Sequence, residues 1–299
     1  MIDRRQVLTA LSALPILATT TQASSAIAVR MSSGISRSMA ALEARSGGRL
    51  GVAVLDTASG KTFGHRADER FAMCSTFKTL IAGLVLKRVD QGKERLDRRI
   101  TYGKGVLMMN SPTTEKHVAD GMTVGELCEA TITLSDNAAA NLLLDTFGGP
   151  AALTAFVRGL GDKVTRTDGY EPDINVVRPG EIHDTTSPNA MLATLRTLTL
   201  GTALSPASRQ RLVGWLVANQ TGDKRLRAGL PAGWKVGDKT GSWSDAGKGT
   251  TNDIAVIWPP GRAPLLITAY LTDARLDSDG RNAVIAEVAR LVIAAGYAT

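Results

Sequence analysis

STFKTLIAGLVLKRVDQ, Ser75–Gln91, is a stretch whose apolar residues follow the spacing of a helix. They recur every three or four positions, at Phe77, Leu80, Ile81, Leu84 and Val85. Ala82 and Leu86 stand on the other side, so this helix is apolar nearly all round. Because a helix of that kind is stable only when it is covered on every side, the sequence predicts a helix buried inside the fold.

Helical patterns continue on both sides of this stretch. After it, we expect helices over Thr123–Leu134, Asn137–Phe147, Pro150–Leu160, Pro188–Leu200 and Pro206–Ala218. Others are expected at Ser36–Ser46 and at Asp279–Ala295. Thr165–Thr186 has no periodicity and contains several Gly and Pro residues, which predicts a long loop. Loops of that length inside a compact domain are often functional.

Strand patterns occur only towards the two ends of the chain. Leu50–Leu55 and Lys61–His65 precede the helices, and Trp234–Thr240, Asp253–Trp258 and Leu265–Leu271 follow them. This order predicts an α/β fold, an antiparallel sheet flanked by helices in a three-layer sandwich, with an all-α domain inserted into it. We expect residues 29–74 and 219–299 to form the sandwich, and residues 75–218 the helical domain with the 165–186 loop.

The first 28 residues have the pattern of an export signal. Arg4 and Arg5 precede an apolar run, Val7–Ala18, that is shorter than the ~20 residues needed to span a bilayer. Ala26-Ile27-Ala28 is typical of a cleavage site, and the paired arginines favour a twin-arginine signal, with a general secretory signal as the alternative. We therefore expect a periplasmic or secreted protein with no stable membrane association after cleavage.

The charge pattern argues against a nucleic-acid partner. The formal net charge is +7, but the basic residues are scattered among acidic ones. A solvated surface explains such a distribution better than a nucleic-acid footprint does. We expect a monomer that acts on small molecules. Cys74 and Cys128 both lie in apolar helical patterns, which favours two buried free thiols over a disulfide.

Three short motifs carry the chemistry. Ser75 and Lys78 form S-x-x-K on the buried helix, where positions i and i+3 share a face and an amine can activate a hydroxyl. Ser135-Asp136-Asn137 stands at a junction between two helices, where a helix cap is the structural alternative. Lys239-Thr240-Gly241 ends a predicted strand and supplies a cation, a hydroxyl and a residue without a side chain. Each motif alone is weak, but the three in this order point to one site.

In this order the motifs resemble those of the penicillin-recognising serine enzymes, which include class A β-lactamases and penicillin-binding proteins. Glu171 and Asn175, in the long loop, are similar to the E-x-x-x-N of the class A Ω-loop. The resemblance runs from about Met31 to the end of the chain and implies a serine β-lactamase. Its substrates would be penicillins and cephalosporins, with carbapenems left open, and it would need no metal ion or organic cofactor.

The resemblance also implies roles for individual residues. Ser75 would attack the lactam carbonyl, with Lys78 or Glu171 as its base, and Ser135 would protonate the departing nitrogen. Glu171 would then hold the water that hydrolyses the acyl-enzyme. The oxyanion hole would consist of the backbone N–H groups of Ser75 and Ser242. Further substrate contacts would come from Asn137, Asn175, Arg225, Lys239, Thr240, Gly241 and Ser242.

Several positions differ from the usual class A pattern. Gly169 replaces an arginine that pairs with the aspartate matching Asp184. Asn110 replaces an aromatic residue beside the cleft, and Trp243 could shape the pocket or cover the sheet edge. The alternatives are a D-Ala-D-Ala carboxypeptidase or transpeptidase and a covalent β-lactam sensor. Both would share the serine and lysine motifs, but neither needs Glu171.

Overall fold

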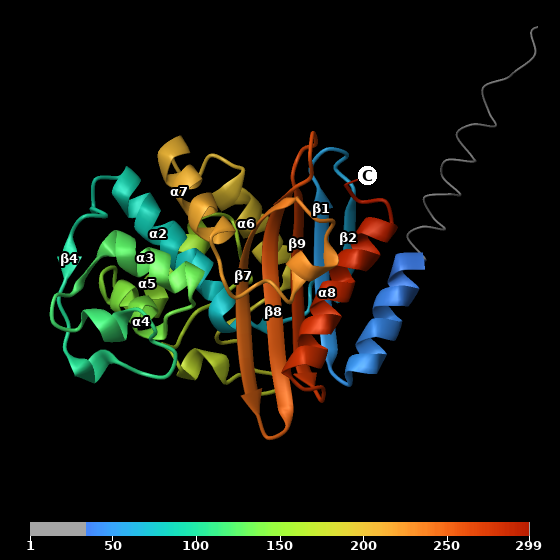
Figure 1. Ribbon diagram of the computed structural model, residues 1–299, viewed down its shortest axis with the longest axis horizontal. Coiled ribbons are helices and arrows are strands. Elements are labelled where there is room, and N and C mark those ends of the chain that lie inside the picture. The colour runs from blue at the N-terminus through green and yellow to red at the C-terminus, as the bar shows by residue number, and fades with distance from the viewer. Residues whose placement is uncertain (1–33, 299) are drawn as a thin grey trace, which may run out of the picture.

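Five antiparallel strands form the main sheet of the computed structural model, which describes residues 34–298. Their order across the sheet is β2-β1-β9-β8-β7 (Figure 1). The strands are β1 (Arg49–Asp56), β2 (Thr62–His65), β7 (Lys235–Asp245), β8 (Lys248–Trp258) and β9 (Leu265–Ala274). Strands from both ends of the chain therefore lie side by side, and β7 forms one edge of the sheet. The predicted α/β fold is confirmed.

Helices cover both faces of this sheet. The carboxyl-terminal helix α8 (Ser278–Ala294) and a helix over residues 34–46 lie on one face (Figure 1). The helix α6 (Pro188–Thr199) contacts β1 and β9 on the other. Alternate residues of β1 supply the two cores, since Leu50, Val52 and Val54 pack under α8 whereas Ala53 faces the helical region. This alternation is the two-residue period of a strand buried on both sides.

The buried helix predicted from the opening stretch is at the centre of the helical region. It starts as a 3₁₀ turn, η1 (Cys74–Phe77), and continues as α2 (Lys78–Asp90). Around it lie α3 (Val124–Thr133), α4 (Asn137–Asp145), α5 (Gly149–Gly159) and α7 (Pro206–Val217). Most of the first eight residues of α2 are fully buried, polar Lys78 included. The tight first turn was not predicted, because a 3₁₀ turn and an α-helix share the same apolar residues over four positions.

Side-chain caps explain where several helices begin. Thr123 and Glu126 form a capping box at the start of α3, and Ser187, Ser205 and Asp277 each accept a backbone N–H at the starts of α6, α7 and α8.

Four short strands were not predicted because two residues cannot show an alternating pattern. They pair as β3 (Phe71–Ala72) with β6 (Thr185–Thr186) and β4 (Arg99–Ile100) with β5 (Met122–Thr123). The remaining 3₁₀ turns are η2 (Lys104–Val106), η3 (Thr114–His117), η4 (Asp173–Asn175) and η5 (Leu226–Gly229).

A charged cluster ties the helix over residues 34–46 to the sheet. Glu43 on that helix accepts hydrogen bonds from Arg66 and faces His65 at 2.6 Å. Burial acts to raise the pKa of the Glu43 carboxyl, but the hydrogen bonds from Arg66 and His65 outweigh it, and the pKa is lowered. The ionised form of Glu43 therefore stabilises the packing of this helix.

Candidate active site

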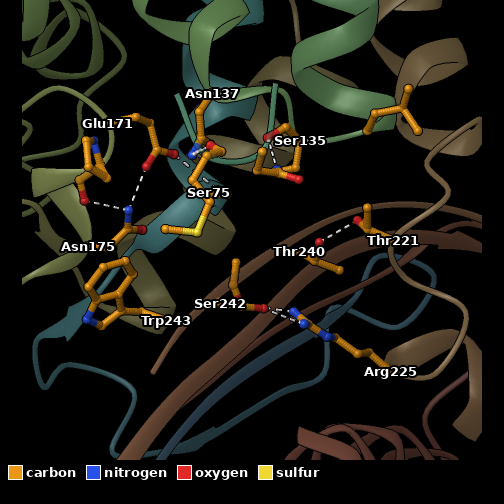
Figure 2. A pocket seen from close by; sticks show the side chains of 15 residues that line it. Ser75, Ser135, Asn137, Glu171, Asn175, Thr221, Arg225, Thr240, Ser242 and Trp243 are labelled. Atoms are coloured by element: carbon orange, nitrogen blue, oxygen red, sulfur yellow. Dashed lines mark hydrogen bonds between the residues drawn. The ribbon is translucent and has the colours of Figure 1, made fainter. Parts of the chain in front are cut away.

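Ser75 lies in the tight turn that precedes α2, where its hydroxyl faces a cavity (Figure 2). Because a 3₁₀ turn has three residues per turn, the side chains at positions i and i+3 eclipse each other. Lys78 is consequently on the same side as Ser75 but is completely buried beneath it. Cys74, immediately before the serine, has a φ of 43°, an uncommon value for a residue with a side chain. Such strain persists only where the surrounding structure enforces it.

The Lys78 ammonium group is surrounded by acceptors. Its Nζ lies 2.8 Å from the Ser135 carbonyl oxygen, 2.6 Å from Asn137 Oδ1 and 3.0 Å from Glu171 Oε1. Burial lowers the pKa of Lys78, and the Glu171 carboxylate opposes that shift. None of these three oxygens carries a proton when Glu171 is ionised. Only a protonated amine can satisfy all of them.

Ser135 and Asn137 are presented by the cap of α4. The intervening Asp136 is the N-cap and accepts the backbone N–H groups of Ala139, Thr113 and Thr114, which fixes the turn. Ser135 itself has a φ of 57°. Its hydroxyl oxygen accepts hydrogen bonds from Lys78 at 3.3 Å and from Lys239 at 3.1 Å. The motif therefore does contain the helix cap considered from the sequence, at Asp136, and the residues on either side of this cap face the site.

Glu171 reaches the site from the long loop, which covers one side of the cavity. Its main chain is held by Asn141, which accepts the Glu171 N–H and donates to the Glu171 carbonyl. Glu171 Oε1 lies 3.3 Å from Ser75 Oγ, and Asn175 Nδ2 donates to Glu171 Oε2 at 2.6 Å. The buried Asn175 Oδ1 has no hydrogen-bond partner among the described residues. A buried acceptor of this kind beside a carboxylate favours a bound water.

Gly169 changes how the long loop is closed. With no arginine at this position, Asp184 Oδ1 instead accepts the backbone N–H groups of Asp168 and Gly169, at 2.7 and 3.0 Å. The Asp184 carbonyl also accepts the Met73 N–H, two residues before Ser75. The base of the loop is thus joined to the turn that carries Ser75 by a backbone hydrogen bond.

The third motif lies on the edge strand β7. Lys239 is fully buried and donates to Ser135 Oγ and to the Thr240 carbonyl. Burial, and then the positive charge of Lys78, lower the pKa of Lys239 well below its usual value. A side chain at Gly241 would place its Cβ 2.8 Å from the Met73 carbonyl oxygen and 3.1 Å from the Ser75 nitrogen. The glycine therefore allows β7 to pack directly against the turn that carries Ser75.

Arg225 lies behind β7 with its guanidinium group beside the same strand. It donates to the carbonyls of Gly241 and Asn252, and its Nη2 donates to Ser242 Oγ at 2.5 Å. No carboxylate lies within 4 Å of it among residues 34–298, although the side chain is almost completely buried. Burial lowers the pKa of Arg225, which still remains a cation. Asp253 and Asp238 act on its charge from a greater distance, so the space beside the guanidinium group is open to an anionic ligand.

One cavity of about 330 Å³ brings the predicted residues together (Figure 2). The predicted residues that line it are Ser75, Ser135, Asn137, Glu171, Asn175, Arg225, Thr240, Gly241 and Ser242. Lys78 and Lys239 are fully buried and do not line it. Trp243 and the exposed Asn110 also line it, so Trp243 shapes the pocket wall. Asn110 donates from its amide to the Ser135 carbonyl.

Other residues of this cavity were not predicted from the sequence, among them Met109, Leu134 and Thr221. Thr221 Oγ1 lies 2.5 Å from Thr240 Oγ1 and donates to Asn219 Oδ1. None of these residues belongs to a motif, and no local pattern distinguishes them. Their positions depend on how separate segments of the chain pack around the cavity.

Other features of the described chain bear on the earlier expectations. Cys74 and Cys128 are buried free thiols, as predicted, and burial raises the pKa of both. Between residues 34 and 298, no group of three acidic, histidine or cysteine side chains could hold a metal ion. Over the same range no helix is long and apolar enough to cross a membrane. The expected signal segment, residues 1–28, is outside the described residues.

Comparison with known proteins gives consistent results. Residues 34–295 match the model of the β-lactamase enzyme family. The chain is 50% identical to β-lactamase L2 of Stenotrophomonas maltophilia, over 84% of this chain and 82% of that protein. It is 48% identical to the carbapenem-hydrolyzing β-lactamase KPC of Klebsiella oxytoca, over 87% and 88% of the two chains. A solved ancestral class A β-lactamase is similar at 70% identity and a TM-score of 0.84, covering 87% of this chain and 99% of that one.

Proposed function

The chain belongs to the class A β-lactamases and hydrolyses β-lactams, and from this premise we propose that Ser75 is the nucleophile that forms the acyl-enzyme. The observation that carries the proposal is the position of Glu171. Its carboxylate lies 3.3 Å from the Ser75 hydroxyl oxygen and 3.0 Å from the Lys78 amine. A carboxylate in that position can take a proton from the serine and later from a water.

Glu171 is the base that removes the Ser75 proton in this proposal. The three proton-free oxygens around Lys78 Nζ support a protonated amine, which cannot accept a further proton. Glu171 Oε1, in contrast, is already the acceptor of the Ser75 hydroxyl. Lys78 then acts as a fixed positive charge that stabilises the negative charge developing beside it.

Ser135 delivers the proton to the lactam nitrogen. Its oxygen accepts N–H groups from both Lys78 and Lys239, so its own hydroxyl proton is directed elsewhere, towards the cavity. As that proton leaves, Lys78 replaces it through the existing hydrogen bond and regains a proton from Glu171, 3.0 Å away, which restores the Glu171 carboxylate for deacylation. The oxyanion hole consists of the Ser75 and Ser242 backbone N–H groups, which Gly241 allows to come close together.

The substrate carboxylate binds at the Arg225 end of the cavity. Among the described residues no carboxylate lies within 4 Å of Arg225, Thr240 and Ser242 line the same space, and the adjacent Lys239 is buried. An anion there gains charge-assisted hydrogen bonds from groups that have already been desolvated by folding. At the opposite side, Asn137 and Asn175 line the cavity where the acylamino group of the substrate binds.

Deacylation separates this enzyme from the two alternatives. Glu171 and the unpaired Asn175 Oδ1 together form a place for the attacking water. A cell-wall peptidase or a covalent sensor uses the same serine and lysines without such a site. The chain also matches relatives named β-lactamases over most of their length, which argues against both alternatives.

The test is hydrolysis of a penicillin, a cephalosporin and a carbapenem by the purified protein and by its Glu171→Ala variant. We expect the wild type to turn over the first two and the variant to accumulate an acyl-enzyme, seen as added mass. The Ser75→Ala/Glu171→Ala double variant should show no added mass. Unchanged steady-state hydrolysis by Glu171→Ala would refute the role of Glu171. One relative is named as carbapenem-hydrolyzing, so the third substrate is included.

We also propose export to the periplasm or medium and action as a monomer. Residues 1–28 would be removed, leaving residues 29–74 with 219–299 as the sandwich domain and residues 75–218 as the helical domain. Amino-terminal sequencing of the exported protein tests the cleavage, and its elution volume on gel filtration tests the monomer.

A further inference from the structure

Three hydrogen bonds join the loop before η3 to the turn between α3 and α4. The Asn137 main-chain N–H donates to the Asn110 carbonyl at 2.9 Å, and the Asn137 side-chain amide donates to the Met109 carbonyl at 2.9 Å. In the opposite direction, Asn110 Nδ2 donates to the Ser135 carbonyl at 2.8 Å. Only this third bond depends on the side chain of Asn110.

The backbone of Asn110 suits this contact. Its φ is 63°, in the left-handed region, where asparagine is one of the few residues with a side chain that occur regularly. The residue is exposed on the rim of the cavity, yet its Nδ2 is turned towards the main chain of the opposite turn. Because packing does not force an exposed side chain into one position, the hydrogen bond itself holds the amide there.

The Ser135 carbonyl oxygen has two donors, one for each of its lone pairs. Lys78 Nζ donates to it at 2.8 Å, and Asn110 Nδ2 at the same distance. Ser135 has a φ of 57°, which persists only where the surrounding structure enforces it. Two donors to one oxygen fix the orientation of this peptide group more tightly than one does. The Ser135 hydroxyl oxygen thereby stays within 3.3 Å of the Lys78 amine and 3.1 Å of the Lys239 amine.

We propose that Asn110 is a positioning residue for acylation, whose amide holds Ser135 in the geometry that delivers a proton to the lactam nitrogen. This inference rests on the proposed function, in which Ser135 is the proton donor and Glu171 with Asn175 holds the deacylating water. Within residues 34–298 the Asn110 side chain has no hydrogen bond to Glu171 or Asn175. Loss of the amide should therefore slow formation of the acyl-enzyme and leave its hydrolysis unchanged.

Two variants remove the donor in different ways. Asn110→Gly deletes the amide and tolerates the positive φ, so it adds no backbone strain. Asn110→Asp keeps the shape of the side chain, but at neutral pH its carboxylate has only acceptors to offer to the Ser135 carbonyl. Lys116→Ala is the matched control, because it removes an exposed side chain on η3, a few residues further along the same loop.

Rapid-quench mass spectrometry of single turnovers measures the rates at which the acyl-enzyme forms and decays. The substrates are benzylpenicillin and 6-aminopenicillanic acid, which is the same bicyclic nucleus without an acyl group. We expect both Asn110 variants to form the acyl-enzyme about fivefold more slowly with either substrate, the effect of one lost hydrogen bond between neutral groups. Its hydrolysis should stay within about twofold of the wild-type rate, and Lys116→Ala should match the wild type in both steps.

The inference is overturned if Asn110→Gly forms the acyl-enzyme at the wild-type rate. Slower formation with benzylpenicillin alone would also overturn it, because Asn110 would then act by touching the acyl group. Equal slowing of formation and hydrolysis, or equal slowing in Lys116→Ala, would show a general loosening of the site and would overturn it too. A wild-type protein that forms no acyl-enzyme would refute the proposed function itself, and the inference with it.

Discussion

Replacing Arg225 with methionine tests the assignment of the substrate carboxylate site. The guanidinium has four hydrogen-bond acceptors, all neutral, and its charge has no acidic partner within 4 Å among the described residues. A substrate carboxylate would be the anion that completes its environment. A hydrogen bond to a charged partner contributes about 1.5–3 kcal/mol, which corresponds to about 10- to 150-fold in KM.

The assay compares benzylpenicillin with its methyl ester, which has the same shape near the lactam but no charge. In the wild type, we expect KM to be far lower for the acid than for the ester. Arg225→Met should raise KM for the acid by the factor above, change KM for the ester little, and leave kcat within a few-fold. Methionine retains much of the buried volume, and removal of a buried charge offsets part of the lost hydrogen bonding.

A measurement of thermal unfolding separates binding from stability. Two carbonyls of paired strands, those of Gly241 and Asn252, lose a donor in this variant, so a modest fall in melting temperature is expected. If KM for the acid and for the ester rose by the same factor, the guanidinium would not bind the carboxylate, and the reasoning would be wrong.

Other predictions follow from single residues. Ser75→Ala should abolish turnover of all β-lactams with an unchanged circular dichroism spectrum, and activity near wild type would contradict the nucleophile assignment. Gly241→Ala should reduce kcat by at least about tenfold, because its Cβ would push β7 from the Ser75 backbone; equal kcat would show that this close approach is not needed. The pKa of Glu43 is lower in the folded protein than in the unfolded chain, so its ionised form stabilises the fold above the unfolded pKa, and the effect is lost as the pH falls through the folded pKa. Glu43→Gln should thus be less stable than the wild type in neutral urea titrations but about equally stable at the lowest pH where both fold. Cys74 and Cys128 should react with a thiol reagent only after unfolding, since burial raises the pKa of both; rapid labelling of the native protein would disagree with their burial.

Much of the fold was predictable because the apolar residues of each long helix or strand repeat with the spacing typical of that element. The apolar residues of α2 repeat every three to four positions, and the strands at both ends of the chain alternate or run apolar. Helix starts were readable where a capping side chain precedes the helix, as at Ser187 and Ser205. By contrast, the strands predicted after Leu230 were too short, since polar residues on the edge strand β7 break the apolar pattern while the backbone pairing continues to Asp245.

The proposed catalytic residues were predictable for a different reason. Ser75, Lys78, Ser135 and Lys239 lie in motifs whose internal spacing matches one turn or one strand end, and the order of the motifs matches a known family. Arg225 was found only through the resemblance. Thr221 and Met109 were not found, because each lies on the cavity through the packing of segments that have no common local pattern.

The amino-acid sequence by itself determined the secondary structure and the chemical groups of this protein, since periodicity, caps and motif spacing depend on neighbours along the chain. The tertiary structure decided the distances between those groups, their partners and their burial. Only the folded chain brings Glu171 to 3.0 Å from Lys78, leaves Asn175 Oδ1 without a partner among the described residues and buries Arg225 behind β7. Such properties depend on residues far apart in the sequence and on the exclusion of water, which no local pattern records.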